Sequence, residues 1–431
     1  MGLFDDQLLI KVAEDTNSRL KGEGFDTSTF IFALNLPTSF HLREYILRKV
    51  YFKDGESFGK KAFKNEASDY FMSQINASFG YKPTLSSDFT VTINLDNKEY
   101  ETQDNDFLLF AFPNEYSSYG SSRKRKTEPV PNEGFNKNKV SNFGNRLTVE
   151  QCRSFKMASP TTKLEATVQL EREAIYLAGR YCKFSRCLPQ SPWSVDIDTP
   201  SIPGNSVSEK IGNILKDFTK ADSHKFLASG REDIDVRMLG EGRPFAVELK
   251  NARLVKGISC HEWGKCDMES NCRSLQDQIN KASTDIKINS LVRVTTKDID
   301  NLIEGQEDKQ KSYTAYCYSK VPLDGELLKE LATKAPIQLI QKTPVRVLKR
   351  RCLMDRPRMI NSMSALQMDP FHFYIRMSTQ AGTYVKEFVH GDFGRTRPCL
   401  SELLGLETGT VDILQLDVEE VDLPWPPKKL G

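Results

Sequence analysis

The most informative segment of this chain reads GREDIDVRMLG at residues 230–240 and continues as EGRPFAVEL at residues 241–249. Two runs of alternating apolar residues flank a turn that contains Gly and Pro, which predicts a β-hairpin. Asp233 and Asp235 would point to one face of a strand, together with Arg231 and Arg237. Burying four charged groups is costly unless they are paired, and such paired groups concentrate at functional sites. The alternative is a solvated ion-pair face on an edge strand.

The elements Arg231-Glu232-Asp233 and Ile234-Asp235-Val236-Arg237 resemble the catalytic motif of a pseudouridine synthase family found in archaea and many eukaryotes. Members of this family modify the T-arm of tRNA. The resemblance places the essential aspartate of the family at Asp233. It implies an α+β fold, with a mixed, largely antiparallel sheet in the catalytic half. A smaller RNA-binding α+β module that contains a THUMP domain would precede that half.

Two later segments resemble further motifs of the family. Residues 311–316 read KSYTAY, and the resemblance makes Tyr313 the aromatic residue that stacks on the target base. Residues 380–396 read QAGTYVKEFVHGDFGRT, and the resemblance makes Lys386 the ion-pair partner of the catalytic aspartate. A nearby cation favours the ionised form of a carboxylate, so this role is chemically reasonable. By pattern alone, Tyr313 would be an ordinary sheet residue and Lys386 a solvated lysine.

Basic residues that alternate with aromatic residues are typical of RNA-binding surfaces, because cations neutralise phosphates and aromatic rings accept unstacked bases. Residues 178–193 have this composition. Residues 341–358 are among the most basic of the chain and mix apolar with cationic side chains, so a strand there could present cations to a phosphate backbone. For the first stretch, the alternative is that Tyr181 is a core residue. For residues 341–358, the alternative is a solvated, charged edge strand. Arg231 would occupy the space that a flipped nucleotide leaves. The RNA-binding residues that we expect are Arg180, Tyr181, Arg186, Arg231, Arg346, Lys349, Arg350, Tyr384 and Arg395.

A chain of 431 residues is too long for one ordinary core, so more than one domain is expected. We expect a THUMP-containing RNA-binding domain at 1–162 and the catalytic domain at 163–431. Residues 113–146 are rich in Ser, Asn, Gly and Pro, which predicts a flexible segment. Its basic cluster at 123–126 is either a nuclear-localisation or RNA-contact patch or a solvated charge cluster. The other expected elements are strands at 30–36, 89–95 and 107–112 and helices at 40–50, 164–181 and 206–218.

Composition restricts the class of protein. Hydrophobic residues make up 39% of the chain and charged residues 27%, which is typical of a soluble globular protein. No run of 18 apolar residues occurs, so no membrane span is expected, and the N-terminus lacks the features of a secretion signal. Nine cysteines without a disulfide-like framework favour a reduced, intracellular protein, in the nucleus, the cytoplasm or both.

Cysteine spacing argues against a zinc site. Cys260, Cys266 and Cys272, with His261 among them, are soft ligands at close range, but their spacing fits no standard zinc knuckle. We therefore expect a surface insertion and no metal there. Animal members of the family can carry paired zinc-binding cysteines in the N-terminal half. No cysteine precedes Cys152, so no such site is expected.

The resemblance implies isomerisation of uridine to pseudouridine at positions 54 and/or 55 of the tRNA T-loop. This reaction breaks a glycosidic C–N bond and forms a C–C bond without an external group, so no cofactor or metal is expected. Asp233 would attack the sugar C1′ or remove a C2′ proton, and Asp235 would support it. One alternative is a catalytically silent RNA-binding protein on the same fold. The other is a carboxylate-based hydrolase acting on a sugar, against which the arginine-rich stretch argues.

Overall fold

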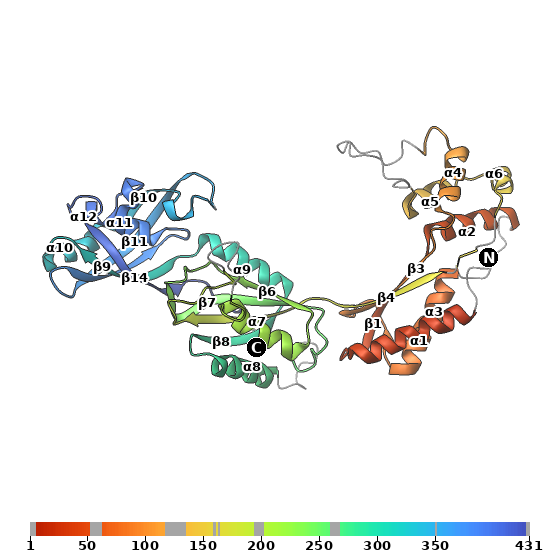
Figure 1. Cartoon of the computed structure of the whole chain (residues 1–431), viewed down its shortest axis with the longest axis horizontal. Coiled ribbons are helices and arrows are strands. Elements are labelled where there is room, and N and C mark those ends of the chain that lie inside the picture. Colours follow the sequence, from red (N-terminus) through yellow and green to blue (C-terminus); the bar gives the residue numbers. More distant parts are fainter. Residues whose placement is uncertain are drawn as a thin grey trace. The chain divides into compact units, whose positions relative to one another are not determined.

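The computed structural model describes residues 6–51, 63–116, 135–157, 161–162, 164–193, 202–258, 268–349 and 351–427. The chain divides into two compact units, Met1–Glu173 and Ala174–Gly431 (Figure 1). This division falls later than the expected boundary at 162/163, because Glu165–Arg172 form strand β4, which pairs with β3 (Phe89–Asp96) of the first unit. None of the helices described is long and apolar enough to cross a membrane.

The first unit is built around a four-stranded sheet with the order β2-β1-β3-β4. Strand β1 (Thr29–Asn35) runs parallel to β2 (Lys82–Pro83) and to β3, whereas β4 is antiparallel to β3. Helices α1 (Asp6–Glu23) and α3 (Phe63–Phe79) contribute apolar side chains to the core of this sheet. The buried residues that join the helices to the strands include Val12, Leu20, Phe71, Ile75, Phe30 and Val91.

A second apolar cluster in this unit lies among four helices. These are α2 (Thr38–Tyr51), α4 (Glu101–Ala111), α5 (Lys137–Gly144) and α6 (Val149–Ser154). Arg43 of α2 forms a buried ion pair with Asp104 of α4, at 3.1 Å.

Two predictions for this unit are wrong. The strand expected at 107–112 belongs to helix α4, because a short apolar run does not distinguish a strand from a buried helix. The flexible segment was predicted too long, since residues 137–144 form α5, whose Val140 and Phe143 are buried. The basic cluster at 123–126 lies outside the described residues.

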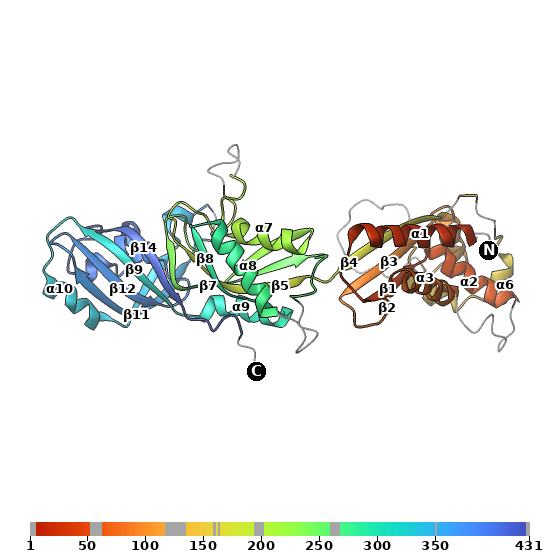
Figure 2. The same ribbon diagram turned by 90° about the horizontal axis from the view of Figure 1, so that it is seen from below.

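The second unit contains one large sheet with the order β13-β10-β11-β12-β9-β14-β7-β5-β8, and β6 also pairs with β7 (Figure 1, Figure 2). Its strand pairs are antiparallel except β7 with β14, which run parallel through Arg237–Met238 and Asp417–Val418. This confirms the expected mixed, largely antiparallel sheet. The strands are β5 (Ile175–Lys183), β6 (Ser223–Ala228), β7 (Arg237–Lys250), β8 (Ile286–Val294), β9 (Lys311–Ser319), β10 (Ile337–Lys342), β11 (Asp355–Gln367), β12 (His372–Thr379), β13 (Thr396–Arg397) and β14 (Val411–Val421).

The sheet of the second unit carries two main hydrophobic cores, one for each half. Helices α7 (Val207–Thr219) and α8 (Met268–Ala282) pack in the core of the β5–β8 half. Helices α10 (Gly325–Glu330), α11 (Val385–His390) and α12 (Leu400–Leu403) pack in the core of the other half. The remaining helix, α9 (Thr296–Asp308), contributes to a smaller cluster with Trp425. The short parallel contact between β7 and β14 joins the two halves of the sheet.

Two further expectations are wrong in this unit. Residues 164–181, predicted to be helical, form β4 and most of β5. Strand β5 is a central strand buried on both faces, so its apolar residues are nearly continuous and imitate a helical pattern. Residues 230–249 form no hairpin, because 229–236 are a loop and Arg237–Lys250 are one long strand. Gly240 and Gly242 lie inside that strand near a register shift, which indicates a bulge instead of a turn.

Candidate active site

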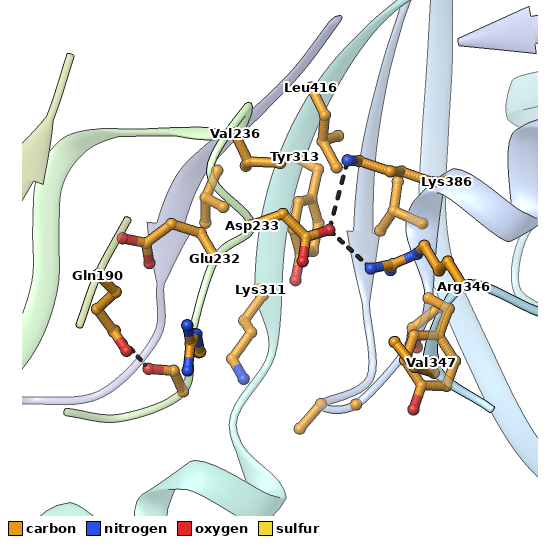
Figure 3. A pocket seen from close by; sticks show the side chains of 18 of the residues that line it. Gln190, Glu232, Asp233, Val236, Lys311, Tyr313, Arg346, Val347, Lys386 and Leu416 are labelled. Carbon is orange, nitrogen blue, oxygen red and sulfur yellow. Dashed lines mark hydrogen bonds and ion pairs between the residues drawn. The ribbon is translucent and has the colours of Figure 1, made fainter. Parts of the chain in front are cut away.

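Asp233 lies on the loop of residues 229–236, between β6 and β7 (Figure 3). Side-chain donors hold the backbone of this loop, and three of the four are buried. The Nζ of Lys183, a fully buried residue, donates to the carbonyl oxygens of Asp233 at 3.0 Å and Ile234 at 2.9 Å. Three more side chains donate to backbone carbonyl oxygens of the loop. Arg243 donates to the carbonyl of Ser229 at 2.8 Å, and Gln190 donates to the carbonyl of Gly230 at 3.0 Å. Arg186 donates to the carbonyl of Asp235 at 2.9 Å. The loop therefore presents Asp233 from a fixed backbone.

Glu232 anchors the same loop through its side chain. It is buried and accepts hydrogen bonds from Arg243 Nε at 2.8 Å and from the hydroxyl of Tyr181 at 2.9 Å. The carboxylates of Glu232 and Asp233 point in opposite directions (Figure 3). Burial raises the pKa of Tyr181 well above its ordinary value, so Tyr181 remains a hydroxyl donor. The Glu232 carboxylate thus stabilises the fold, whereas the Asp233 carboxylate remains available in the cavity.

Two cations contact the Asp233 carboxylate. Arg346 Nη1 lies 2.9 Å from Asp233 Oδ2, and Lys386 Nζ lies 3.4 Å from the same oxygen (Figure 3). Lys386 is closer to Asp235, at 2.7 Å. Partial burial opposes ionisation of Asp235, but the hydrogen bonds and charge of Lys386 outweigh it, so the net pKa of Asp235 is lowered. Among the described residues, Arg346, which was expected to contact RNA, is therefore the cation nearest to Asp233.

Arg346 is itself held by a buried carboxylate. It lies in the 3₁₀ turn Val345–Val347, and its Nε donates to Glu387 Oε1 at 2.7 Å. Glu387 belongs to α11 and follows Lys386 directly, so one helix supports both cations near Asp233. The side chain of Glu387 is 1% exposed.

A cavity of about 1080 Å³ opens in front of Asp233. Tyr313 of β9 and Tyr384 line it, together with Trp193. Its lining carries more cations than carboxylates: Arg231, Arg243, Lys311, Arg346, Arg351, Arg356, Arg358 and Lys386, against Glu232 and Asp233. A concave, cationic surface with aromatic side chains suits a single-stranded nucleic acid, whose phosphates are anionic and whose bases stack.

The two tyrosines of the cavity are fixed in different ways. Burial raises the pKa of Tyr313, while Arg243 lowers it and Glu232 raises it, and the net shift is upward, so Tyr313 is a neutral phenol. Tyr384 is locked through its backbone, because Gln341 both donates to its carbonyl and accepts from its N–H at 2.9 Å. The Arg346 guanidinium lies 6.0 Å from the centre of the Tyr384 ring.

Several expected RNA-binding residues are used inside the fold. Arg180 is buried and donates to the carbonyls of the C-terminal segment, including Val421 at 2.9 Å. Tyr181 is fully buried, and Arg186 binds Asp417 at 2.7 Å. Arg395 donates to the carbonyl of Thr343 at 2.7 Å. These contacts indicate structural roles for Arg180, Tyr181 and Arg186 where RNA contacts were expected.

Other expected residues stay at the surface or outside the described chain. Arg231 is exposed and lines the cavity, whereas Lys349 is exposed and does not line it. Arg350, Cys260 and Cys266 lie outside the described residues. Cys272 is buried in α8. Among the residues that the structure describes, no group of three or more His, Cys, Asp or Glu side chains is placed to hold a metal ion.

Sequence reasoning missed the residues that support the site. Their only signal is a polar residue within an otherwise apolar run, as for Lys183 in β5 and Arg243 in β7. Such a residue is costly to bury unless it is paired, which points to a specific partner without identifying it. The other missed residues are Gln190, Glu232, Lys311 and Glu387.

Comparison with known proteins gives consistent matches. A family model described as "Pus10, C-terminal" matches residues 176–422. The human protein named "tRNA pseudouridine synthase Pus10" is 34% identical over 420 residues, which cover 95% of this chain and 75% of the human protein. The mouse protein of that name is 44% identical over 260 residues, which cover 60% of this chain and 46% of its own length. A protein of the same name from the archaeon Thermofilum pendens is 33% identical over 257 residues, which cover 59% of this chain and 54% of the archaeal protein.

The matched segment thus spans three quarters of the human relative and about half of the mouse and archaeal ones. Among solved structures, a Cbf5-Nop10-Gar1 complex matches 56% of this chain and 58% of its own chain, at 14% identity and a TM-score of 0.28. A likeness at this level carries no argument of its own.

Proposed function

This chain belongs to the Pus10 family of tRNA pseudouridine synthases, and we propose that it isomerises uridine to pseudouridine in the T-loop of tRNA. The target is the uridine at position 54, at position 55 or at both. One observation supports this most strongly. The Asp233 carboxylate faces a cationic cavity, with Arg346 at 2.9 Å and Lys386 at 3.4 Å.

Asp233 is the catalytic carboxylate in this proposal. Attack on the sugar C1′ and removal of a C2′ proton both need an ionised carboxylate at the base of a pocket that admits a nucleotide. Arg346 and Lys386 place two positive charges beside this carboxylate. Asp235 competes for Lys386, so its role is to position this lysine between the two carboxylates.

The target base would have to leave its stack to reach Asp233. Tyr313 lines the cavity and is the residue on which the flipped uracil would stack. Arg231 is an exposed residue of the same loop as Asp233, and it would occupy the space that the nucleotide leaves. The cationic wall formed by Arg351, Arg356 and Arg358 would bind the phosphates on either side.

The first unit would supply additional tRNA binding. A THUMP domain within residues 1–162 is the proposal that follows from the family resemblance, and the α+β organisation of this unit is compatible with it. Lys349 is an exposed cation next to the turn that carries Arg346, and it would extend the phosphate contacts beyond the cavity. The proposed location of the protein is the nucleus, the cytoplasm or both.

The test is pseudouridine formation in unmodified tRNA transcripts, mapped by position, with wild type, Asp233→Asn and Asp235→Asn. We expect product with wild type, none with Asp233→Asn, and reduced but measurable product with Asp235→Asn. Asn keeps the shape of Asp and removes the charge, so the comparison isolates the carboxylate. Circular dichroism and thermal unfolding of each variant show that the fold is retained.

Other outcomes would change the assignment. Loss of product only with Asp235→Asn would move the catalytic role by two residues. If the wild type binds tRNA but forms no product from any tRNA, a catalytically silent RNA-binding protein would be favoured. Product at a position outside the T-loop would keep the reaction and overturn the proposed substrate site.

A further inference from the structure

Lys311 is a buried cation that faces the cavity. It begins strand β9, two residues before Tyr313, and it is 8% exposed. Its side chain is among those that line the cavity (Figure 3). Arg243 and Gly230 also line it. A Cβ atom on Gly230 would lie 3.3 Å from Lys311 Nζ and 2.8 Å from Arg243 Nη1. The absence of a side chain at residue 230 therefore keeps the space around both cations open.

The ammonium of Lys311 has no hydrogen-bond or ion-pair partner among the residues that the structure describes. The other buried lysine of the site, Lys183, donates to three carbonyl oxygens, and Lys386 binds two carboxylates. The neighbouring cation Arg243 is neutralised by Glu232 at 2.8 Å. Lys311 is therefore the lysine of this cavity whose charge the fold leaves uncompensated.

We propose that Lys311 binds a backbone phosphate of the RNA strand that enters the cavity with the target nucleotide. This inference rests on the proposed function, and it identifies the group that recognises the strand next to the reaction centre. An anion compensates the buried charge and satisfies the free donors, whereas a neutral uracil carbonyl would do only the second. Lys311 and Tyr313 are on the same face of β9, so one strand would bind the phosphate and the base.

The lowered pKa of Lys311 is consistent with a site that lacks an anion until the ligand binds. Burial, and then the positive charge of Arg243, lower the pKa of Lys311 to about 8. A phosphate beside the ammonium would reverse this effect and favour the charged form. RNA binding is then coupled to proton uptake above pH 8, and this uptake disappears when residue 311 does not titrate.

The first experiment measures the affinity for unmodified tRNA as a function of salt. It uses Asp233→Asn protein with and without Lys311→Met, so binding is separated from catalysis. Loss of one phosphate contact reduces the slope of log K against log salt by about 0.7 to 0.9. Lys311→Arg should preserve most of the slope. Lys287→Met, which removes an exposed strand lysine outside the cavity, is the matched control for a general loss of charge.

The second experiment locates the phosphate. A set of T-arm RNAs carries a single neutral methylphosphonate at successive positions near the target uridine. We expect one position at which the substitution weakens binding about tenfold with Lys311 present and less than about twofold with Lys311→Met. Thermal unfolding of Lys311→Met, and of Lys311→Gln as a second variant, verifies that the fold is retained.

The outcomes separate the two proposals. An unchanged salt slope, with methylphosphonate effects that are equal in both proteins, overturns the role of Lys311 and leaves the proposed function. A reduced slope without pseudouridine from wild type overturns the proposed reaction and keeps Lys311 as an RNA-binding residue. Failure to bind tRNA at all overturns both.

Discussion

Arg346 connects two carboxylates that differ in their surroundings. Its Nη1 lies 2.9 Å from the half-exposed Asp233, and its Nε lies 2.7 Å from Glu387, which is buried. A buried carboxylate that remains paired gives the guanidinium a fixed orientation, because an arginine presents its donors in a rigid plane. Glu387 is therefore a positioning residue for Arg346, which contacts the proposed catalytic carboxylate.

Replacement of Glu387 by Gln should lower kcat about tenfold, equivalent to about 1.4 kcal/mol, with little change in KM. The amide keeps the size of the side chain but no longer attracts Arg346, so Arg346 loses its orientation relative to Asp233. Single-turnover kinetics on tRNA would measure the effect, and Glu387→Asp should recover part of the rate.

A matched control is Asp104→Asn, which breaks another buried arginine pair, with Arg43, in the first unit. This variant should lower the stability of its unit and leave kcat unchanged. Equal losses of kcat in both variants would show that Glu387 acts through general stability alone.

At the level of elements, the type of sheet was predicted correctly, whereas the assignment of individual segments to strands, helices and loops was less accurate. The mixed, largely antiparallel sheet was predicted, but the loop of Asp233 was mistaken for a strand and β5 for a helix. Both errors have a physical cause. The loop owes its shape to donors that are distant in sequence, such as Arg186 and Lys183. Strand β5 is buried on both faces, so its apolar residues imitate a helical pattern. Arg346 and Asp233 are 113 residues apart, and no local pattern indicates which of many cations meets the carboxylate.

The junction of β7 and β14 depends on Asp417. This carboxylate of β14 binds Arg237 of β7 at 2.5 Å and Arg186 at 2.7 Å. Burial alone would raise the pKa of Asp417, but the hydrogen bonds and charges of Arg237 and Arg186 lower it below the ordinary value. Its contribution to stability is therefore complete above the ordinary pKa of an aspartate and is lost as the pH falls through the lower, folded value.

Asp417→Asn should lower the free energy of unfolding at pH 7 by about 1–2 kcal/mol, because these ion pairs are only partly buried. The difference from wild type should begin to shrink as the pH falls below about 4, the ordinary pKa of an aspartate, and should vanish below the lower pKa that Asp417 has in the folded protein. Urea unfolding of both proteins between pH 7 and pH 3 measures this. A difference that is independent of pH would rule out the ionic explanation.

On the scale of the whole molecule, each unit has its own hydrophobic core, and the described residues of the cavity all belong to the second unit. The division lies between β4 and β5, at Glu173/Ala174. The second unit therefore contains the entire proposed reaction centre, and the first unit would contribute to tRNA affinity.

A fragment of residues 174–431 should fold cooperatively and retain a kcat within a few-fold of the full chain, with KM for tRNA raised about tenfold or more. Steady-state kinetics of both proteins on the same transcript would measure the two quantities. A fragment that folds but has lost kcat would show that the first unit completes the site.

The parallel contact of β7 and β14 has a consequence for how the sequence can change. Asp233 precedes β7, whereas Arg346, Lys386 and Tyr313 belong to the half that contains β9, β10 and α11. The contact has only two residue pairs. The distance from Asp233 to Arg346 and Lys386 therefore depends on how the side chains of both halves pack. We therefore expect a change in the volume of either core, even far from the cavity, to alter the distance between Asp233 and its cations.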